Sequence, residues 1–221
     1  MDNVKILDCT LRDGGYYNNW DFSKKFANRY LNVISKTSVN TIEIGFRKPI
    51  NNIGAGPSGL KKIGNFLDTK ETLVSKLFIP KQKTIAVMID LSDYIGKDSY
   101  KNLRNNFKNS KRSRVKFVRI ACNVEDKYRL PKVVKYLKKQ KYIVGANLMK
   151  FTILSNNEIY SFFKVAQKSG VDYMYLADSF GNCVPKKINN ICRYLNKKGF
   201  NLNKFGFHSH DNTGNALKNT I

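Results

Sequence analysis

Two histidines, two residues apart, are the first candidates for chemistry. His208 and His210 lie in the run FGFHSHDNTG and are the only histidines among 221 residues. In a β-strand, residues i and i+2 point to the same side, so the two imidazoles would offer a pair of nitrogen ligands to a divalent metal. An H-x-H pattern is weak by itself, and two buried, hydrogen-bonded histidines are the alternative.

A basic and an acidic residue lie near the other end of the chain, in LDCTLRDGGYYNNWDF. Arg12 and Asp13 come directly before a Gly-Gly pair where the first predicted strand ends, and ligands of α/β folds bind at that edge of the sheet. Asp13 with His208 and His210 would form an N/O set suited to Mn²⁺, Mg²⁺, Zn²⁺ or Fe²⁺, with open positions for a 2-oxo acid. Arg12 would stabilise an enolate there, and a surface salt bridge is its alternative role.

The elements that must position these residues alternate between strand and helix. Short β-branched and apolar runs predict seven strands, each buried on both faces as in parallel sheets: residues 4–11, 41–46, 84–90, 115–123, 142–151, 171–178 and 204–211. Amphipathic spacing, with Gly or Pro at several borders, predicts helices between them, among them residues 23–36, 130–140, 156–170 and 185–199.

The spacing of the strands favours one fold class. Strand starts recur at intervals of roughly thirty residues, the size of one βαβ unit, which indicates an α/β fold with right-handed crossovers. An open doubly wound sheet and a closed TIM (β/α)8 barrel both fit this alternation. A barrel needs eight strands and about 250 residues, whereas this sequence shows seven and stops in NALKNTI. We therefore expect one domain over residues 1–221, a C-terminally incomplete TIM barrel truncated after strand seven.

Three motifs together resemble one family. TLRDG near the N-terminus, IEIGF with Glu43 on the second strand and HSHDN on the seventh resemble the DRE-TIM metallolyases, the HMG-CoA lyase-like superfamily. The resemblance implies that Asp13, His208 and His210 bind the metal, with Mn²⁺ expected first and Mg²⁺, Zn²⁺ or Co²⁺ as alternatives. It also implies that Arg12 stabilises the enolate and that Glu43 completes an Asp-Arg-Glu signature, in catalysis or by holding Arg12 or a metal-bound water.

Within that family, VGANLMKFTILSNNEI and YMYLADSFGNCVPKKI are similar to strands five and six of the 4-hydroxy-2-oxoacid aldolases. The similarity implies that Ser179 helps to hold the carboxylate of pyruvate, while a helix cap is the alternative for Asp178 and Ser179. Those aldolases carry a catalytic histidine where this chain has Tyr16. A tyrosine titrates near 10, so the general base stays open among Tyr16, Tyr17, a metal-bound hydroxide and a residue of an eighth unit.

The function predicted from these residues is that of a divalent-metal-dependent carbon–carbon lyase, an aldolase that works next to a 2-oxo acid through a pyruvate enolate. One alternative is an acyl-CoA condensing enzyme of the isopropylmalate or citramalate synthase type, although those sequences resemble HTHND where this chain has HSHDN. A second alternative is a non-catalytic, basic binding module on the same fold, which the net charge of +24 suggests.

The composition of the chain limits the classes of partner that we expect. Lys and Arg number 40 against 16 Asp and Glu, but the lysines lie mostly beside Asn, Ile, Tyr and Phe, a bias of A+T-rich genomes, so no nucleic-acid partner is expected. No apolar run of about 18 residues and no signal segment occurs, and the four cysteines lack disulfide spacing, which predicts a cytoplasmic chain with no membrane partner. The substrate expected is a small 2-oxo acid, and a homo-oligomer or a partner dehydrogenase is the expected protein partner.

A glycine-rich run is set aside as a cofactor site. GAGPSG, residues 54–59, satisfies the G-x-G-x-x-G pattern of dinucleotide-binding proteins. It trails the second predicted strand by several residues, contains Pro57 and opens no strand-turn-helix unit of the kind that such a site needs. We therefore expect a long loop in this segment.

Overall fold

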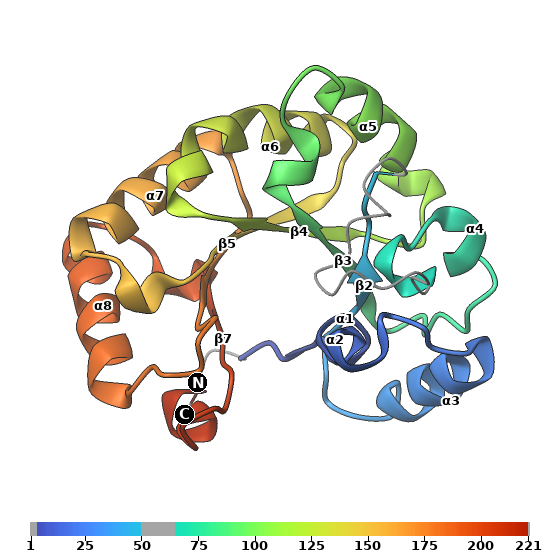
Figure 1. Cartoon of the computed structure of the whole chain (residues 1–221), viewed down its shortest axis with the longest axis horizontal. Coiled ribbons are helices and arrows are strands. Elements are labelled where there is room, and N and C mark those ends of the chain that lie inside the picture. The colour runs from blue at the N-terminus through green and yellow to red at the C-terminus, as the bar shows by residue number, and fades with distance from the viewer. Residues whose placement is uncertain (1–3, 50–64, 221) are drawn as a thin grey trace. The chain divides into compact units, whose positions relative to one another are not determined.

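The computed structural model describes residues 4–49 and 65–220. Its strands are β1 (Leu7–Asp8), β2 (Thr41–Phe46), β3 (Thr84–Asp90), β4 (Phe117–Cys122), β5 (Ile143–Leu148), β6 (Tyr173–Ala177) and β7 (Phe205–His208). They follow chain order in one sheet, from β1 to β7. Most of these strands are labelled in Figure 1. The β1–β2, β2–β3, β5–β6 and β6–β7 pairs are parallel, as the sequence predicts.

Helices alternate with these strands. They are α1 (Thr10–Asp13), α2 (Gly15–Asn18), α3 (Lys24–Ile34), α4 (Glu71–Val74), α5 (Ser99–Asn106), α6 (Leu130–Lys139), α7 (Asn156–Ser169), α8 (Pro185–Lys197) and α9 (Ala216–Thr220). Amphipathic spacing predicts α3, α6, α7 and α8 to within a few residues at each end, which confirms those four predictions. In the part of the chain that the structure describes, each helix is too short or too polar to cross a bilayer.

The chain packs into two compact units. The first comprises the described residues through Arg119 together with Lys139–Ile143, and it holds β1, β2 and β3. The second comprises Ile120–Lys138 and the residues from Val144 onward, and it holds β6, β7 and nearly all of β5. Strand β4 is divided between the two units. The expectation of a single incomplete domain over residues 1–221 stays a prediction.

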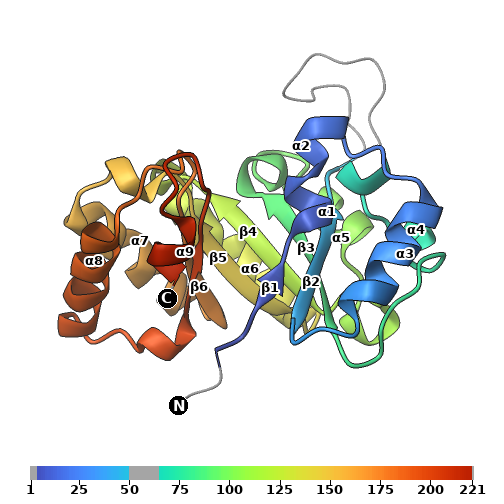
Figure 2. The same cartoon turned by 90° about the horizontal axis from the view of Figure 1, so that it is seen from below.

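In the first unit, β2 lies between β1 and β3, with Thr41 beside both Leu7 and Thr84. Helices α1 and α2 follow directly where β1 ends (Figure 2). Helix α3 begins after Ser23, whose hydroxyl accepts a hydrogen bond from the Phe26 amide at 3.1 Å and so satisfies an N–H of the first turn. The apolar face of α3 is thereby held toward the core of this unit.

A bulge in β2 shapes the end of that strand. The register with β3 shifts between Glu43 and Phe46, and Gly45 between them has a φ of 152°. A Cβ at Gly45 would lie 2.2 Å from the carbonyl oxygen of Phe66. Glycine is therefore required where the bulge turns the strand toward its last residue.

In the second unit, β6 lies between β5 and β7, with Ala177 beside His208. Helix α7 begins with a capping box, in which the Ser155 hydroxyl and the Glu158 carboxylate satisfy each other's backbone N–H groups. Helix α8 starts at Pro185, whose missing N–H costs nothing in the first turn. These two helices lie side by side (Figures 1 and 2).

Burial departs from the prediction at the two ends of the sheet. All six residues of β4 and most of β2 and β3 are buried, as expected of strands covered on both faces. The four residues of β7 are each half-buried, and β1 has only two residues. Each of these strands pairs with a single neighbour in the described sheet, so the prediction of full burial is wrong there. The glycine-rich run at residues 54–59 lies outside the described residues.

Candidate active site

Arg12 lies in α1, directly after β1, and its guanidinium is held from two sides. Nε donates to Glu43 Oε1 at 2.7 Å, and Nη1 pairs with the Asp13 carboxylate. The side chain is buried, and Nη2 has no hydrogen-bond partner within the described residues. A buried N–H without an acceptor costs free energy. Nη2 is thus a donor placed for an acceptor that a ligand would bring.

Glu43, in β2, is fully buried and bridges two arginines. Its Oε1 accepts from Arg12, and its Oε2 accepts from Arg119 Nη1 at 3.0 Å. Arg119 is itself buried, in the middle of β4. Sequence reasoning did not single out Arg119, although a lone arginine inside the apolar run VKFVRIACN was the available signal. The carboxylate thus links the guanidinium groups of Arg12 and Arg119.

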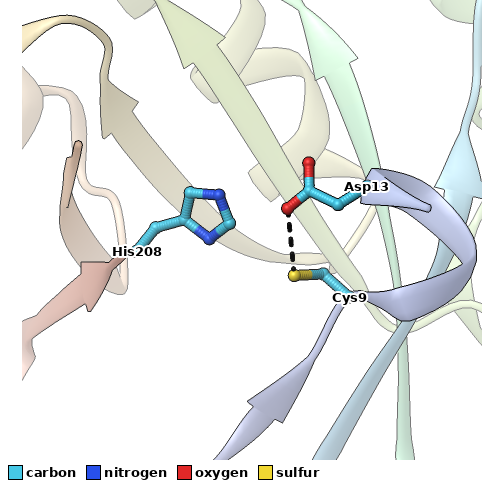
Figure 3. A group of neighbouring side chains, drawn as sticks. All are labelled: Cys9, Asp13 and His208. Atoms are coloured by element: carbon cyan, nitrogen blue, oxygen red, sulfur yellow. Dashed lines mark hydrogen bonds between the residues drawn. The ribbon is translucent and has the colours of Figure 1, made fainter. Parts of the chain in front are cut away.

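The charges of this group are set by its burial and its partners. Burial by itself lowers the pKa of Arg12, but the Glu43 and Asp13 carboxylates outweigh that effect and hold the pKa above its ordinary value. The thiol of Cys9 donates to Asp13 Oδ2 at 3.4 Å (Figure 3). Burial raises the pKa of Cys9 to about 12. At neutral pH, Asp13 therefore faces one charged donor and one neutral donor.

Tyr16, in α2, lies edge-on to Trp20 with ring centroids 4.8 Å apart and to Phe46 at 6.5 Å. Although 56% of the residue is exposed, its partial burial is the main cause that raises the pKa of Tyr16. The phenol stays protonated at neutral pH and can donate a hydrogen bond. A raised pKa makes it a still poorer proton acceptor than the sequence alone suggests.

His208 and His210 converge in the second unit. Strand β7 ends at His208, so the prediction that strand alternation aligns both residues is wrong for His210. The two Nε2 atoms nevertheless lie 3.2 Å apart, and the His208 ring projects from the end of β7 (Figure 3). His210 Nδ1 lies 2.8 Å from the carbonyl oxygen of Asp178. As the donor in that bond, Nδ1 makes Nε2 the acceptor nitrogen of the His210 ring, the form of imidazole that binds metals.

The spacing of this histidine pair fits a metal centre. Two nitrogens 3.2 Å apart, each about 2.1 Å from one ion, subtend an angle of about 100° at it. That angle lies between the octahedral and tetrahedral values, so the two imidazoles can be adjacent ligands in either geometry. Neutral imidazoles suit Mn²⁺, Fe²⁺, Co²⁺ and Zn²⁺.

Asp178 and Ser179 follow β6 and shape the turn next to the histidines. The buried Asp178 carboxylate accepts from the amides of Asn182 at 3.2 Å and Cys183 at 3.0 Å. It closes a turn and caps no helix, because α8 is preceded by Val184 without a side-chain cap; the helix-cap alternative is wrong. Ser179 Oγ accepts from the Lys150 amide at 2.9 Å and donates weakly, over 3.5 Å, to a backbone carbonyl. Its proton is available to a stronger acceptor.

The candidate residues therefore form two sets. Arg12, Asp13 and Glu43 contact one another in the first unit. His208 and His210 contact each other in the second unit. Cys9, Cys122, Cys183 and Cys192 are all free thiols, as their spacing predicts.

Comparison with protein families gives one match along nearly the whole chain. A family model described as HMGL-like matches residues 3–221. The chain is 24% identical to a 4-hydroxy-2-oxovalerate aldolase of Geobacillus genomosp. 3 over 218 residues, which is 99% of this chain and 60% of the relative. It is 25% identical to a 4-hydroxy-2-oxovalerate aldolase of Pelotomaculum thermopropionicum, covering 100% of this chain and 61% of that relative. The chain thus spans about 60% of the length of the curated relatives it matches.

Solved structures agree on the fold. The N-terminal domain of a Bacteroides vulgatus protein provisionally described as an aldolase superposes with a TM-score of 0.76 at 29% identity, covering 99% of this chain and 68% of that one. The HMG-CoA lyase of Bacillus subtilis superposes with a TM-score of 0.75 at 16% identity, covering 99% and 72%. These likenesses confirm the predicted fold class, an α/β chain that follows a TIM-barrel strand order through its seventh strand.

Proposed function

Since the chain belongs to the HMGL-like family, we propose that it is a divalent-metal-dependent aldolase that cleaves or forms a carbon–carbon bond next to a 2-oxo acid. One observation carries this proposal: a buried arginine, clamped by two carboxylates, keeps one N–H without an acceptor at the end of a strand. The names of the curated relatives support pyruvate as the enolate-forming half of the substrate.

The metal in this proposal is held by Asp13, His208 and His210, with Mn²⁺ expected first. Support comes from the 3.2 Å separation of the two Nε2 atoms, which suits adjacent ligands, and from the position of Asp13 at the end of α1, the short helix that follows β1. When bound, such an ion polarises the keto oxygen of the substrate as a Lewis acid.

Arg12 supplies the second stabilisation of negative charge. When the bond between C3 and C4 of a 4-hydroxy-2-oxo acid breaks, its electron pair moves into the pyruvyl half and gives an enolate. Nη2 of Arg12 donates to the developing oxyanion, while Glu43, itself bound by Arg119, holds the guanidinium so that no reorientation is needed during the reaction. The raised pKa of Arg12 keeps this donor charged throughout.

Two further side chains contact the substrate in this proposal. The Ser179 hydroxyl, whose present donor contact is long, donates to the pyruvyl carboxylate. The protonated phenol of Tyr16 donates to the oxygen of the aldehyde half. In both roles a protonated hydroxyl acts as a hydrogen-bond donor, and neither role requires Tyr16 to act as a base.

The test is the release of pyruvate from 4-hydroxy-2-oxo acids with and without added Mn²⁺, in the wild type and in Asp13→Asn. We expect metal-dependent release by the wild type and a loss of at least about 100-fold in the variant. Asp126→Asn, which changes an exposed ion pair with Arg129, is the matched control and is expected to behave as the wild type. Equal rates in all four conditions would end the proposal.

A further inference from the structure

A lysine held by two carboxylates lies where β2 and β3 end, in the same unit as Arg12. Lys48 follows β2, Asp90 is the last residue of β3, and Asp93 lies in the helical turn after it. Lys48 Nζ lies 2.6 Å from Asp90 Oδ2 and 3.0 Å from Asp93 Oδ2. The carboxyl ends of parallel strands are where α/β folds place their chemistry.

This group shares an aromatic ring with Arg12. The Phe46 ring has Lys48 Nζ at 5.5 Å from its centroid and the Arg12 guanidinium carbon at 5.8 Å. The Tyr16 ring lies edge-on to the same ring. The charges of Asp90 and Lys48 act on the Tyr16 phenol as well, in opposite directions. Lys48 and its carboxylates therefore border the surface that carries Arg12 and Tyr16.

Lys48, Asp90 and Asp93 together carry a net negative charge, although the whole chain is strongly basic. Two carboxylates face one ammonium, although the whole chain has only 16 acidic residues against 40 basic ones. One carboxylate would suffice to neutralise Lys48. Asp90 also keeps 33% of its side chain exposed, and only Oδ2 is used in its bond to Lys48. Its Oδ1 takes no part in that bond, and Asp90 is the more exposed of the two carboxylates.

The reaction needs a proton acceptor that the site described so far lacks. Cleavage of a 4-hydroxy-2-oxo acid requires removal of the proton of the C4 hydroxyl. The Tyr16 phenol has a raised pKa and is protonated. The Arg12 guanidinium is charged, and its neighbour Asp13 is engaged by Arg12 and Cys9. Asp90 and Asp93 are the carboxylates that remain beside this surface, and Asp90 is the more exposed of the two, at 33% against 12%.

We propose that Asp90, oriented by Lys48, is the base that takes the proton of the substrate hydroxyl, an inference that rests on the proposed aldolase function. The proton passes to Asp90 as the C4–O bond becomes a carbonyl and the C3–C4 bond breaks. The electron pair of that bond stays on the pyruvyl half as the enolate, and the same proton then returns to C3 to give pyruvate. No other reactant is needed, and the aldehyde leaves.

Lys48 acts in this account as a positioning residue. Its ammonium donates to Asp90 and Asp93 at once, so it fixes the Asp90 carboxylate at the strand end. Because these carboxylates outweigh its partial burial, the pKa of Lys48 is raised, and it stays a cation that does not compete for the substrate proton.

Two reactions, each assayed on the full chain with Mn²⁺, distinguish the role of Asp90 as a base from the roles of the other site residues. Aldol cleavage needs the hydroxyl proton removed, whereas decarboxylation of oxaloacetate gives the same pyruvate enolate by losing CO₂ and needs no base. For Asp90→Asn we expect kcat for cleavage to fall by about 100-fold or more while decarboxylation changes by less than about threefold. Asp90→Glu is expected to restore part of the cleavage.

The controls make each outcome decisive. Asp93→Asn removes the other carboxylate that binds Lys48. The fold-decrease of its kcat for cleavage is expected to be at least about tenfold smaller than that of Asp90→Asn. Circular dichroism of each variant checks that the fold is retained, and Asp90→Glu serves if Asp90→Asn does not fold. Equal losses of both reactions, or unchanged cleavage in Asp90→Asn, would overturn the inference. A wild type that decarboxylates nothing would remove the proposed function itself, and this inference with it.

Discussion

The substitution Glu43→Gln tests the buried group that orients Arg12. Glu43 is fully buried and gives one oxygen to Arg12 at 2.7 Å and the other to Arg119 at 3.0 Å. Glutamine has nearly the same shape, but it carries no charge and replaces one oxygen with an NH₂ group. One arginine therefore keeps a neutral acceptor, and the other faces a donor. Two buried cations then share no counter-charge at this position.

The expected loss of stability follows from these bonds. A hydrogen bond to a charged group contributes about 1.5–3 kcal/mol, and removing one partner of a buried ion pair costs about 3–5 kcal/mol. We therefore expect Glu43→Gln to lower the free energy of unfolding by about 3 kcal/mol or more. Asp126→Asn breaks a pair with Arg129, whose side chain is 61% exposed, and is expected to cost less than about 0.5 kcal/mol.

Urea unfolding, followed by tryptophan fluorescence, measures both values. Trp20 is the sole tryptophan, and its Nε1 donates to the Arg12 carbonyl at 2.7 Å, so the signal reports on the segment that carries Arg12. Circular dichroism provides a second probe of the same transition. If Glu43→Gln unfolds with the same free energy as Asp126→Asn, the buried carboxylate does not hold the two arginines as described.

Urea unfolding also checks three other features. Ser155→Ala removes the capping box of α7 and is expected to cost about 1 kcal/mol, against less than about 0.5 kcal/mol for Ser161→Ala in the middle of that helix. Gly45→Ala, at φ 152° against a carbonyl oxygen, is expected to cost clearly more than about 2 kcal/mol, and Gly96→Ala, in open space, about 1 kcal/mol. Burial raises the pKa of Cys122 from 9.0 to about 12. The neutral thiol therefore contributes stability that is complete below pH 9 and is lost as the pH rises toward 12. Between these values, the free energy of unfolding of Cys122→Ala should fall by about 1.4 kcal/mol per pH unit less than that of the wild type. Equal costs within either pair, or an unchanged slope, would contradict the corresponding statement.

The strands and main helices were predictable because their signals are local. The β-branched runs at residues 41–46 and 84–90 coincide with β2 and β3 at both ends. Helix α7 carries its start and stop in its own sequence, with Ser155 and Glu158 at one end and Gly170 in a left-handed conformation at the other. Capping, periodicity and turn residues act within a few positions, so a single sequence contains them.

Partners distant in sequence were harder to predict. The motif around Arg12 drew attention to Glu43 through a family resemblance, but nothing adjacent to Arg119 says that it shares the same carboxylate, 76 residues away. Likewise, Lys48 meets Asp90 and Asp93 only because parallel β2 and β3 end together and a bulge at Gly45 shifts their register. Tertiary contacts of this kind depend on where strands end, which pattern reading fixes only to within a few residues.

The two histidines lie close together for a reason other than the predicted strand alternation. Strand periodicity predicted that His208 and His210 share a face, yet β7 ends at His208. What brings the second ring alongside the first is the contact of His210 Nδ1 with the Asp178 carbonyl in the turn after β6. A backbone acceptor from another element thus replaces the strand geometry, and its position is set by the packing of β6 against β7.

The most direct test of the account is a titration of the protein with Mn²⁺, in which free Mn²⁺ is measured by electron paramagnetic resonance. We expect one tightly bound ion per chain, and a loss of affinity of more than about 100-fold in Asp13→Asn and in His210→Gln, because a lost ligand costs more than a lost outer partner. Asp126→Asn should bind as the wild type does. Binding of Mn²⁺ that is the same in wild type, Asp13→Asn and His210→Gln would contradict the shared metal centre.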